Sequence, residues 1–353
     1  MLKCALPVIS ALFCLSAASV VHASGDPEEA DAGAWTMSDA GVRVAAAGIA
    51  APTTAASLSL QKTGEISNGG KSIDNYAQYV SEDGAIQATL YIYLPTYADA
   101  ALGAYMTDRA IAERFGNRTR RTAYDSVAAA GRPGTAIRAV YDDAAEGELT
   151  TAAAFVHAGR WMVKLRVTGP SARRGDVTAG IDALLAGLHV DAQTPLHAAM
   201  PPVVGACPAA STVPARPFSQ ESARSTDGEA RAPGFPRDGQ DALCVRGRVD
   251  TAEGSYDILQ AAGAANGSIL IPMDDAGTVM AFDPVEGAAD RKGGYRLSIH
   301  SVGRTDIYTA YDRLPSASQM AAILTGSDPA ATRIRSTTAY AANGDRSVTP
   351  GGR

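Results

Sequence analysis

Apolar and polar residues alternate along several short segments in the first half of the chain. From Ile86 to Leu94, every second residue is apolar, and the residues between are polar or aromatic. A two-residue period is typical of a β-strand that buries one face. We expect this strand to form a hairpin with residues 76–80, turning at Asp83 and Gly84, a pair that suits tight turns. The same pattern predicts strands at residues 57–66, 135–141, 149–157 and 161–168.

Two segments carry the signals of helices. Pro95 ends the alternation, and Thr96 with Asp99 resembles a capping box, so a helix is predicted to run to Phe115. A second helix is predicted over residues 177–188, with Asp176 as its N-cap. Its apolar residues recur at the helical period and form one stripe that must be buried against a sheet: Val177, Ile181, Leu184, Leu185 and Leu188.

Residues 57–190 are thus predicted to form a first domain, ordered as strand, hairpin, helix, three antiparallel strands and helix. The residues that carry this order are the strand 88–95 running into its helix, the hairpin 155–161 and the closing helix to Leu188. The order resembles the PsbP/DcrB/Mog1-like group of α/β/α sandwich domains. The resemblance implies a fold, and that group has no shared catalytic site to carry over.

The C-terminal part has shorter alternating segments and tight-turn residues at 266–267 and 275–277. Ser316 and Gln319 form a capping box, which predicts a short helix ending at Gly326. We expect a second, strand-rich domain over residues 241–340 and a loose tail over 341–353. Its predicted strands are 243–249, 256–261, 268–273, 278–282, 295–300, 306–311 and 332–340.

Two segments lack these patterns. Residues 24–56 are predicted to be a flexible leader with a first strand around 42–49, and residues 191–240 a Pro-rich linker. The fold class is therefore predicted as α+β, with two small domains. Each domain is expected to contain a mostly antiparallel sheet with one or two packed helices.

The first 23 residues are predicted to be a secretory signal peptide. Lys3 precedes a stretch without charge from Cys4 to Val21, and the small residue Ala23 favours cleavage before Ser24. An uncleaved membrane anchor is the alternative, which Pro7 and the cleavage site disfavour. We expect a periplasmic or secreted protein with no transmembrane segment after cleavage.

Charge and cysteine content narrow the expected partners. The formal net charge of −6 becomes −7 once Lys3 is removed, so neither nucleic acid nor anionic lipid is an expected partner. Of the 31 basic residues, 26 are arginine, which weakens functional interpretations of arginine clusters. Cys207 and Cys244 remain after cleavage, and an even pair in an oxidising compartment predicts one disulfide.

No motif for a metal, a cofactor or catalysis emerges. The histidines of the mature chain are not at metal-ligand spacing, and no cofactor is predicted. The best nucleophilic set places Ser298 and His300 on one strand, with Asp306 on the next. Side chains at i and i+2 of a strand lie roughly 7 Å apart, too far for direct contact without bending. An exposed polar sheet face is therefore the favoured interpretation.

Candidate binding residues lie on strands of the first domain. Arg138, Lys164 and Arg166 carry positive charge, and Tyr91 and Tyr93 face away from Leu90 and Ile92. Further arginines follow the first helix: Arg114, Arg118, Arg120 and Arg121. The basic residues are suited to an anionic ligand or an acidic partner, with an ordinary exposed sheet face as the alternative. The tyrosines are contact residues if their face is open and core residues if a helix covers it.

Three functional hypotheses follow. The leading one is an exported, non-enzymatic binding or envelope-accessory protein. The second is a periplasmic hydrolase whose site is assembled across strands of the C-terminal domain. The third is a protein that binds an anionic small ligand on the basic sheet face of the first domain.

Overall fold

The computed structural model describes residues 34–67, 71–207, 213–218, 243–252, 254–261, 267–285 and 293–351. The predicted signal peptide, its cleavage site and most of the Pro-rich linker lie outside these ranges. The described chain is rich in strands, with 51% strand and 16% helix, in agreement with an α+β class. None of its helices combines the length and hydrophobicity needed to cross a bilayer.

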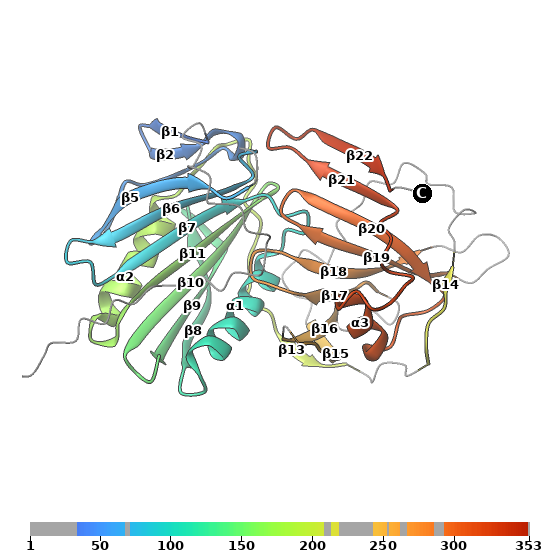
Figure 1. The fold of residues 1–353 in the computed structure, drawn as a ribbon. Coiled ribbons are helices and arrows are strands. Elements are labelled where there is room, and N and C mark those ends of the chain that lie inside the picture. Colours follow the sequence, from blue (N-terminus) through green and yellow to red (C-terminus); the bar gives the residue numbers. More distant parts are fainter. Residues whose placement is uncertain are drawn as a thin grey trace, which may run out of the picture.

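An eight-stranded antiparallel sheet forms the N-terminal half (Figure 1), in the order β4-β5-β6-β7-β11-β10-β9-β8. The predicted hairpin is present as β6 and β7, paired from Asp74 opposite Tyr93 to Val80 opposite Gln87. The strands are β4 (Thr54–Ala55), β5 (Leu58–Glu65), β6 (Asp74–Ser81), β7 (Gln87–Tyr93), β8 (Arg120–Ala129), β9 (Arg132–Ala144), β10 (Leu149–Ala158) and β11 (Trp161–Pro170).

Two helices pack on opposite faces of this sheet. Helix α2 (Arg174–Gly187) buries its predicted stripe against residues such as Val163 and Leu165. Helix α1 (Ala100–Phe115) covers β9 and β10 on the other face. The carboxylate of Asp99 caps α1, accepting hydrogen bonds from the backbone N–H groups of Ala101 and Leu102.

A ten-stranded sheet forms the C-terminal half, and the predicted capping box begins α3 (Ala317–Leu324) on one of its faces. Its strands are β13 (Val204–Ala206), β14 (Pro217–Phe218), β15 (Leu243–Asp250), β16 (Ser255–Ala261), β17 (Ile269–Pro272), β18 (Val279–Val285), β19 (Gly294–Ser301), β20 (Arg304–Tyr311), β21 (Ser336–Tyr340) and β22 (Arg346–Pro350). A small third sheet contains β1 (Trp35–Ser38), β2 (Gly41–Val44), β3 (Ile49–Ala51) and β12 (His189–Val190).

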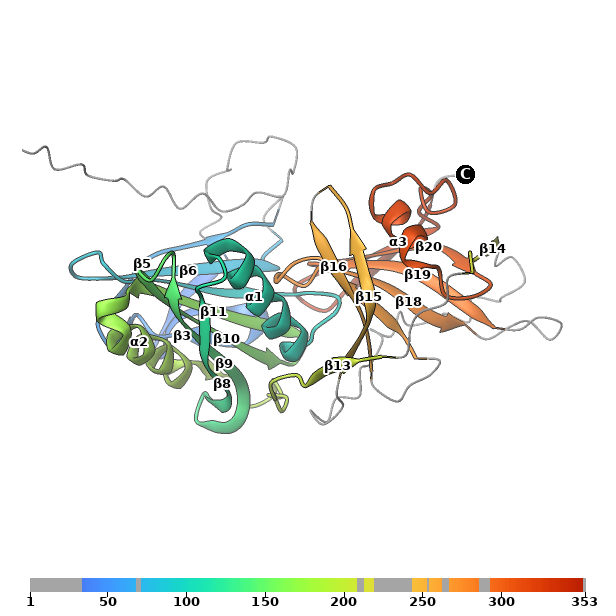
Figure 2. The same cartoon turned by 90° about the horizontal axis from the view of Figure 1, so that it is seen from below.

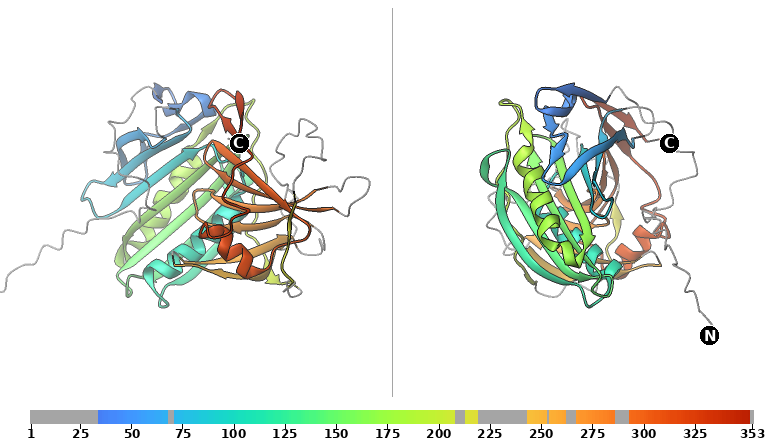
Figure 3. Two further views of the ribbon diagram at one scale, coloured as in Figure 1. Left: turned by 45° about the vertical axis from the view of Figure 1, so that its right-hand side comes forward. Right: turned by 90° about the vertical axis from the view of Figure 1, so that its left-hand side faces the viewer.

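Helix α1 lies between the two large sheets (Figures 2 and 3). On the side away from the first sheet, Leu102 and the preceding Tyr97 pack with Leu259, Leu270 and other residues of the second sheet. The layers therefore run α2, eight-stranded sheet, α1, ten-stranded sheet, α3. The division into two domains stays a prediction, since α1 packs on both sheets.

Five details differ from the sequence-based predictions. The N-cap of α1 is Asp99 and not Thr96, so the helix begins three residues later than the predicted capping box implies. Strand β8 was not predicted, because its residues show no clear alternation and are mostly exposed. The supposedly loose tail contains β22, and the described part of the leader forms β1 to β4. Helix α2 starts before Asp176, which lies in its first turn and is not the N-cap.

A disulfide between Cys207 and Cys244 holds the first part of the linker on the second sheet. The two cysteines are separated by 37 positions, and their Cα atoms are 5.0 Å apart. Just before Cys207, β13 pairs in parallel with β15, placing Gly205 opposite Cys244. The predicted disulfide is therefore present, and it fixes an otherwise exposed edge strand.

Replacing Cys207 and Cys244 with serine should lower the free energy of unfolding by about 2–4 kcal/mol, because the link closes a loop of about 38 residues. Urea unfolding of the double variant measures this loss. The wild-type protein should lose the same amount when a thiol reductant is added. Unchanged stability in both cases would contradict a stabilising role.

Candidate functional site

Three of the residues predicted for binding, Tyr91, Tyr93 and Lys164, lie at the contact between the two sheets. The turn 274–277 between β17 and β18 packs against β7, β11 and α1, and we call this contact the seam. Here the Lys164 ammonium lies 2.6 Å from Oδ2 of Asp275, and the hydroxyl of Thr107 donates to the same oxygen over 3.1 Å. Lys164 is only 12% exposed. The cation expected to meet a ligand is therefore neutralised within the chain.

A second ionic contact joins α1 to the ten-stranded sheet. The Asp257 carboxylate on β16 is 3% exposed and pairs with Arg109 and Arg248. It also accepts a hydrogen bond from the hydroxyl of Tyr105. Sequence patterns gave no signal for this cluster, and they identified Asp275 only as part of a tight turn. Asp257 is instead a buried partner of cations, and Asp275 is a partly exposed partner of Lys164.

The seam also contains an acid that forms no ion pair with any described residue. Asp74 begins β6, opposite Tyr93, and its pKa is raised from 3.8 to about 7. Burial is the main cause, and the nearby charges of Glu65 and Asp274 add to it, while Lys164 opposes them. Asp74 therefore exchanges its proton near neutral pH, although no pattern in the sequence distinguishes it.

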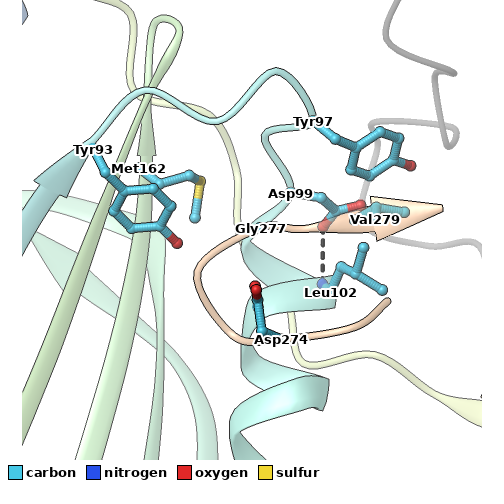
Figure 4. Close-up of a pocket in the computed structure, with 9 residues that line it drawn as sticks. Tyr93, Tyr97, Asp99, Leu102, Met162, Asp274, Gly277 and Val279 are labelled. Atoms are coloured by element: carbon cyan, nitrogen blue, oxygen red, sulfur yellow. Dashed lines mark hydrogen bonds between the residues drawn. The ribbon is translucent and has the colours of Figure 1, made fainter. Parts of the chain in front are cut away.

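A small cavity opens at the same place (Figure 4). Tyr93 and Met162 enter it from the first sheet, and Asp274 and Gly277 from the turn. Its free space holds about one water molecule. Such a volume suits a bridging water rather than an organic substrate.

The three basic candidates do not share one face. Arg138 lies on the α2 face of the sheet, where its guanidinium contacts Asp182 at 2.7 Å and Asp125 at 3.6 Å. Lys164 and Arg166 lie on the α1 face. The sequence analysis grouped these three basic residues, and this grouping is wrong. Arg138 lies opposite Ala154 on β10, and the alternation of side chains along a strand places both on the α2 face.

Arg166 differs from the other candidates in having no acidic partner. No described residue places a carboxylate within ion-pair distance of its largely buried guanidinium, which lies 5.6 Å from the centre of the Phe115 ring. The guanidinium of Arg114 lies 5.5 Å from the same ring. Burial, followed by repulsion from Arg114, lowers the pKa of Arg166. The other arginines after α1 have partners: Arg118 with Glu146, Arg120 with Asp143 and Arg121 with Asp108.

The two candidate tyrosines have different surroundings. Tyr93 is 4% exposed and packs in the core under α1. Tyr91 is partly exposed, and the Lys164 ammonium lies 5.7 Å from its ring centre. Helix α1 thus covers the half of this face above β9 and β10. Alternate residues of β6, β7 and β11 on the remaining half stay partly open.

Ser298 and His300 are in direct contact, contrary to expectation. The serine hydroxyl lies 3.0 Å from Nε2 of the histidine, where a β-bulge shifts the register of β19 against β20. The two residues are 1% and 2% exposed, so this is not a solvated face. The ring of Tyr97 covers the histidine, with its centroid 5.9 Å away.

The remaining contacts of this pair do not form a Ser-His-Asp arrangement. Nδ1 of His300 lies 3.2 Å from the hydroxyl of Thr305 and 3.3 Å from that of Thr96. Asp306, the expected acid, contacts Arg304 and the hydroxyl of Thr337 instead. The group therefore serves as a buried hydrogen-bond chain across the contact of the two sheets.

Comparisons with known proteins find no matching family model, no matching curated protein and no matching solved structure. The resemblance of residues 57–190 to the PsbP/DcrB/Mog1-like group accordingly rests on element order alone.

Replacing Asp74 with asparagine should stabilise the protein above neutral pH. Folding favours the protonated acid, so Asp74 reduces stability as the pH rises from about 4 through 7. We expect the variant to gain about 2–4 kcal/mol over wild type near pH 8, and the difference to vanish near pH 4. Thermal unfolding across this range measures it, with the exposed Asp39→Asn as the control. If the variant differed from wild type in stability by the same amount at low and at high pH, the effect would come from packing rather than from charge.

His300 should make the protein sensitive to acid. Burial, with a smaller contribution from Arg296, lowers its pKa from 6.5 to about 4, so folding favours the neutral ring. Stability is lost as the pH falls from about 6.5 to 4, by up to about 3 kcal/mol. In denaturant unfolding, His300→Gln should not show this loss of stability at low pH. The control His189→Gln, at an exposed position, should show the same loss as wild type. If stability fell with pH equally in wild type and in His300→Gln, His300 would not be the cause of the acid sensitivity.

Proposed function

We propose that this chain is an exported, non-enzymatic binding protein of the bacterial envelope, whose ligand or partner presents a phosphate or carboxylate group. The binding surface is the open part of the α1 face of the eight-stranded sheet, next to Phe115. The observation that carries the proposal is Arg166, a largely buried cation with no carboxylate in reach among the described residues.

Physical chemistry favours an anion at this position. A guanidinium withdrawn from water without an acid partner is costly, and a bound anion offsets that cost. Its planar fork matches the two oxygens of a carboxylate or phosphate. Arg114 approaches the same aromatic ring and repels Arg166, while the charge of Asp275 partly offsets this repulsion from beyond ion-pair distance.

Neighbouring residues add polar groups to this surface. Thr89 lies directly opposite Arg166 on β7, and Tyr91 follows on the same face. Both are partly exposed, and a hydrogen bond links their side chains, so together they form a polar group beside the arginine. Lys164, in contrast, is already engaged by Asp275. The anion is therefore assigned to the Arg166 end of the face.

The disulfide supports the proposed compartment. Disulfides such as that of Cys207 and Cys244 persist in oxidising environments like the periplasm. The predicted signal peptide leads to the same compartment, and an envelope location is part of the proposal.

Arg166→Gln should weaken binding of phosphate or citrate at least about tenfold, because it removes a charge-assisted, bidentate contact. Titration calorimetry with the mature protein measures the affinity. The matched control is Arg138→Gln, on the same sheet but on the opposite face and already paired with Asp182. This control should leave the affinity unchanged.

The stability of the two variants gives a second readout. Arg166→Gln should unfold at the same or a higher temperature than wild type, since it removes an uncompensated buried cation. If neither anion binds wild type, or if both variants bind equally well, Arg166 is not an anion site and the proposed function fails.

A further inference from the structure

The last strand of the ten-stranded sheet presents an open edge. β22 pairs with β21 on one side, and no described strand pairs with its other side. All five of its residues are exposed, and Val348 is 63% exposed although it is apolar. Edge strands of this kind present unpaired backbone groups that another strand can bind.

The hydrogen bonds of the hairpin reveal which backbone groups face outward. The N–H of Gly351 donates to the carbonyl oxygen of Arg335, and the N–H of Ala341 donates to that of Asp345. Successive residues of a strand direct their N–H and C=O groups to opposite sides. Ser347 and Thr349 therefore form their backbone hydrogen bonds with β21. The N–H and C=O groups of Arg346 and Val348 therefore point outward, together with the C=O of Pro350.

This outward pattern is complementary to itself. In an antiparallel pair with a two-fold axis at Val348, the two copies of Val348 exchange both of their hydrogen bonds. Arg346 then lies opposite Pro350 of the other copy, and its N–H meets the proline carbonyl. Pro350 has no N–H to offer, which removes one hydrogen bond at each end.

The side chains suit the same register. The valine side chains of the two copies lie across the axis, a favourable β-branched pair. Arg346 meets a proline rather than a second arginine, and Ser347 meets Thr349. No like charges lie opposite one another, as they would with Arg346 facing its own copy.

We propose that β22 is a self-association edge, which pairs antiparallel with β22 of a second copy about a two-fold axis at Val348. The two ten-stranded sheets then become one continuous sheet. The contact is small, so the dimer forms in a concentration-dependent manner. This inference is independent of the anion site, which lies on the other sheet.

Val348→Pro tests the edge without disturbing the hairpin. The substitution removes an outward N–H that has no partner in the monomer, as Pro350 already does two residues later. Sedimentation equilibrium of the mature wild-type protein should show a monomer–dimer equilibrium, and Val348→Pro should raise its dissociation constant at least about tenfold. The matched variant Val348→Thr keeps the backbone donor and should dimerise like wild type.

A crosslinking experiment tests the register directly. In the proposed pair, the Cα atoms at position 348 lie about 5.5 Å apart, within disulfide range. Val348→Cys should therefore give a covalent dimer on mild oxidation. Thr349→Cys should not, because its two copies are displaced by two residues, beyond about 7 Å.

Three results would overturn the proposal. One is a wild-type protein that stays monomeric at all concentrations. Another is a dimer that Val348→Pro leaves intact, which would use a different surface. The third is equal crosslinking at positions 348 and 349, which would indicate random collision. Circular dichroism of each variant checks its fold, and Val348→Lys, which places two ammonium groups across the axis, replaces the proline variant if that one unfolds.

Discussion

The arrangement depends on one helix that is buried from two sides. Small residues such as Ala100 and Ala104 bring α1 close to the first sheet, and Gly103 allows the Phe155 ring to approach the helix backbone, where a Cβ would lie 2.9 Å from it. On its other side, Leu102 packs against the second sheet. Because α1 cannot shift toward one sheet without opening a gap at the other, it fixes the distance between the two halves.

This double packing determines the electrostatics of the seam. Charges that would be solvated on a lone sheet become buried between two, so each needs a partner or a shifted pKa. Lys164 forms an ion pair with Asp275, and Asp257 forms ion pairs with Arg109 and Arg248. Asp74 remains without a cation of its own and stays protonated to a higher pH. Arg166 lies just beyond the part that α1 covers, which leaves it beside open sheet.

Two features of the surface suggest how such a protein meets other molecules. Arg166 provides charge on the face of one sheet, and β22 provides backbone hydrogen bonds at the edge of the other. The two are physically different modes of recognition. A change at one is not expected to alter the other, which allows each proposal to be judged by itself.

Local sequence patterns were sufficient to predict most of the strands and helices. Alternation predicted β6, β7, β10, β11 and β15 to β20, the capping box of Ser316 placed the start of α3, and the cysteine count predicted the disulfide. Strands β8 and β22 were not predicted because most of their residues are exposed and they have no regular apolar period. Four of the five candidate binding residues lie on the α1 face, near the seam, yet their roles differ. The tertiary structure alone decides that Lys164 is neutralised, that Arg138 faces α2, and that Ser298 and His300 are buried in contact with each other. The partners of Lys164 and Arg138 lie far away in the sequence, and local periodicity carries no information about such distant pairs.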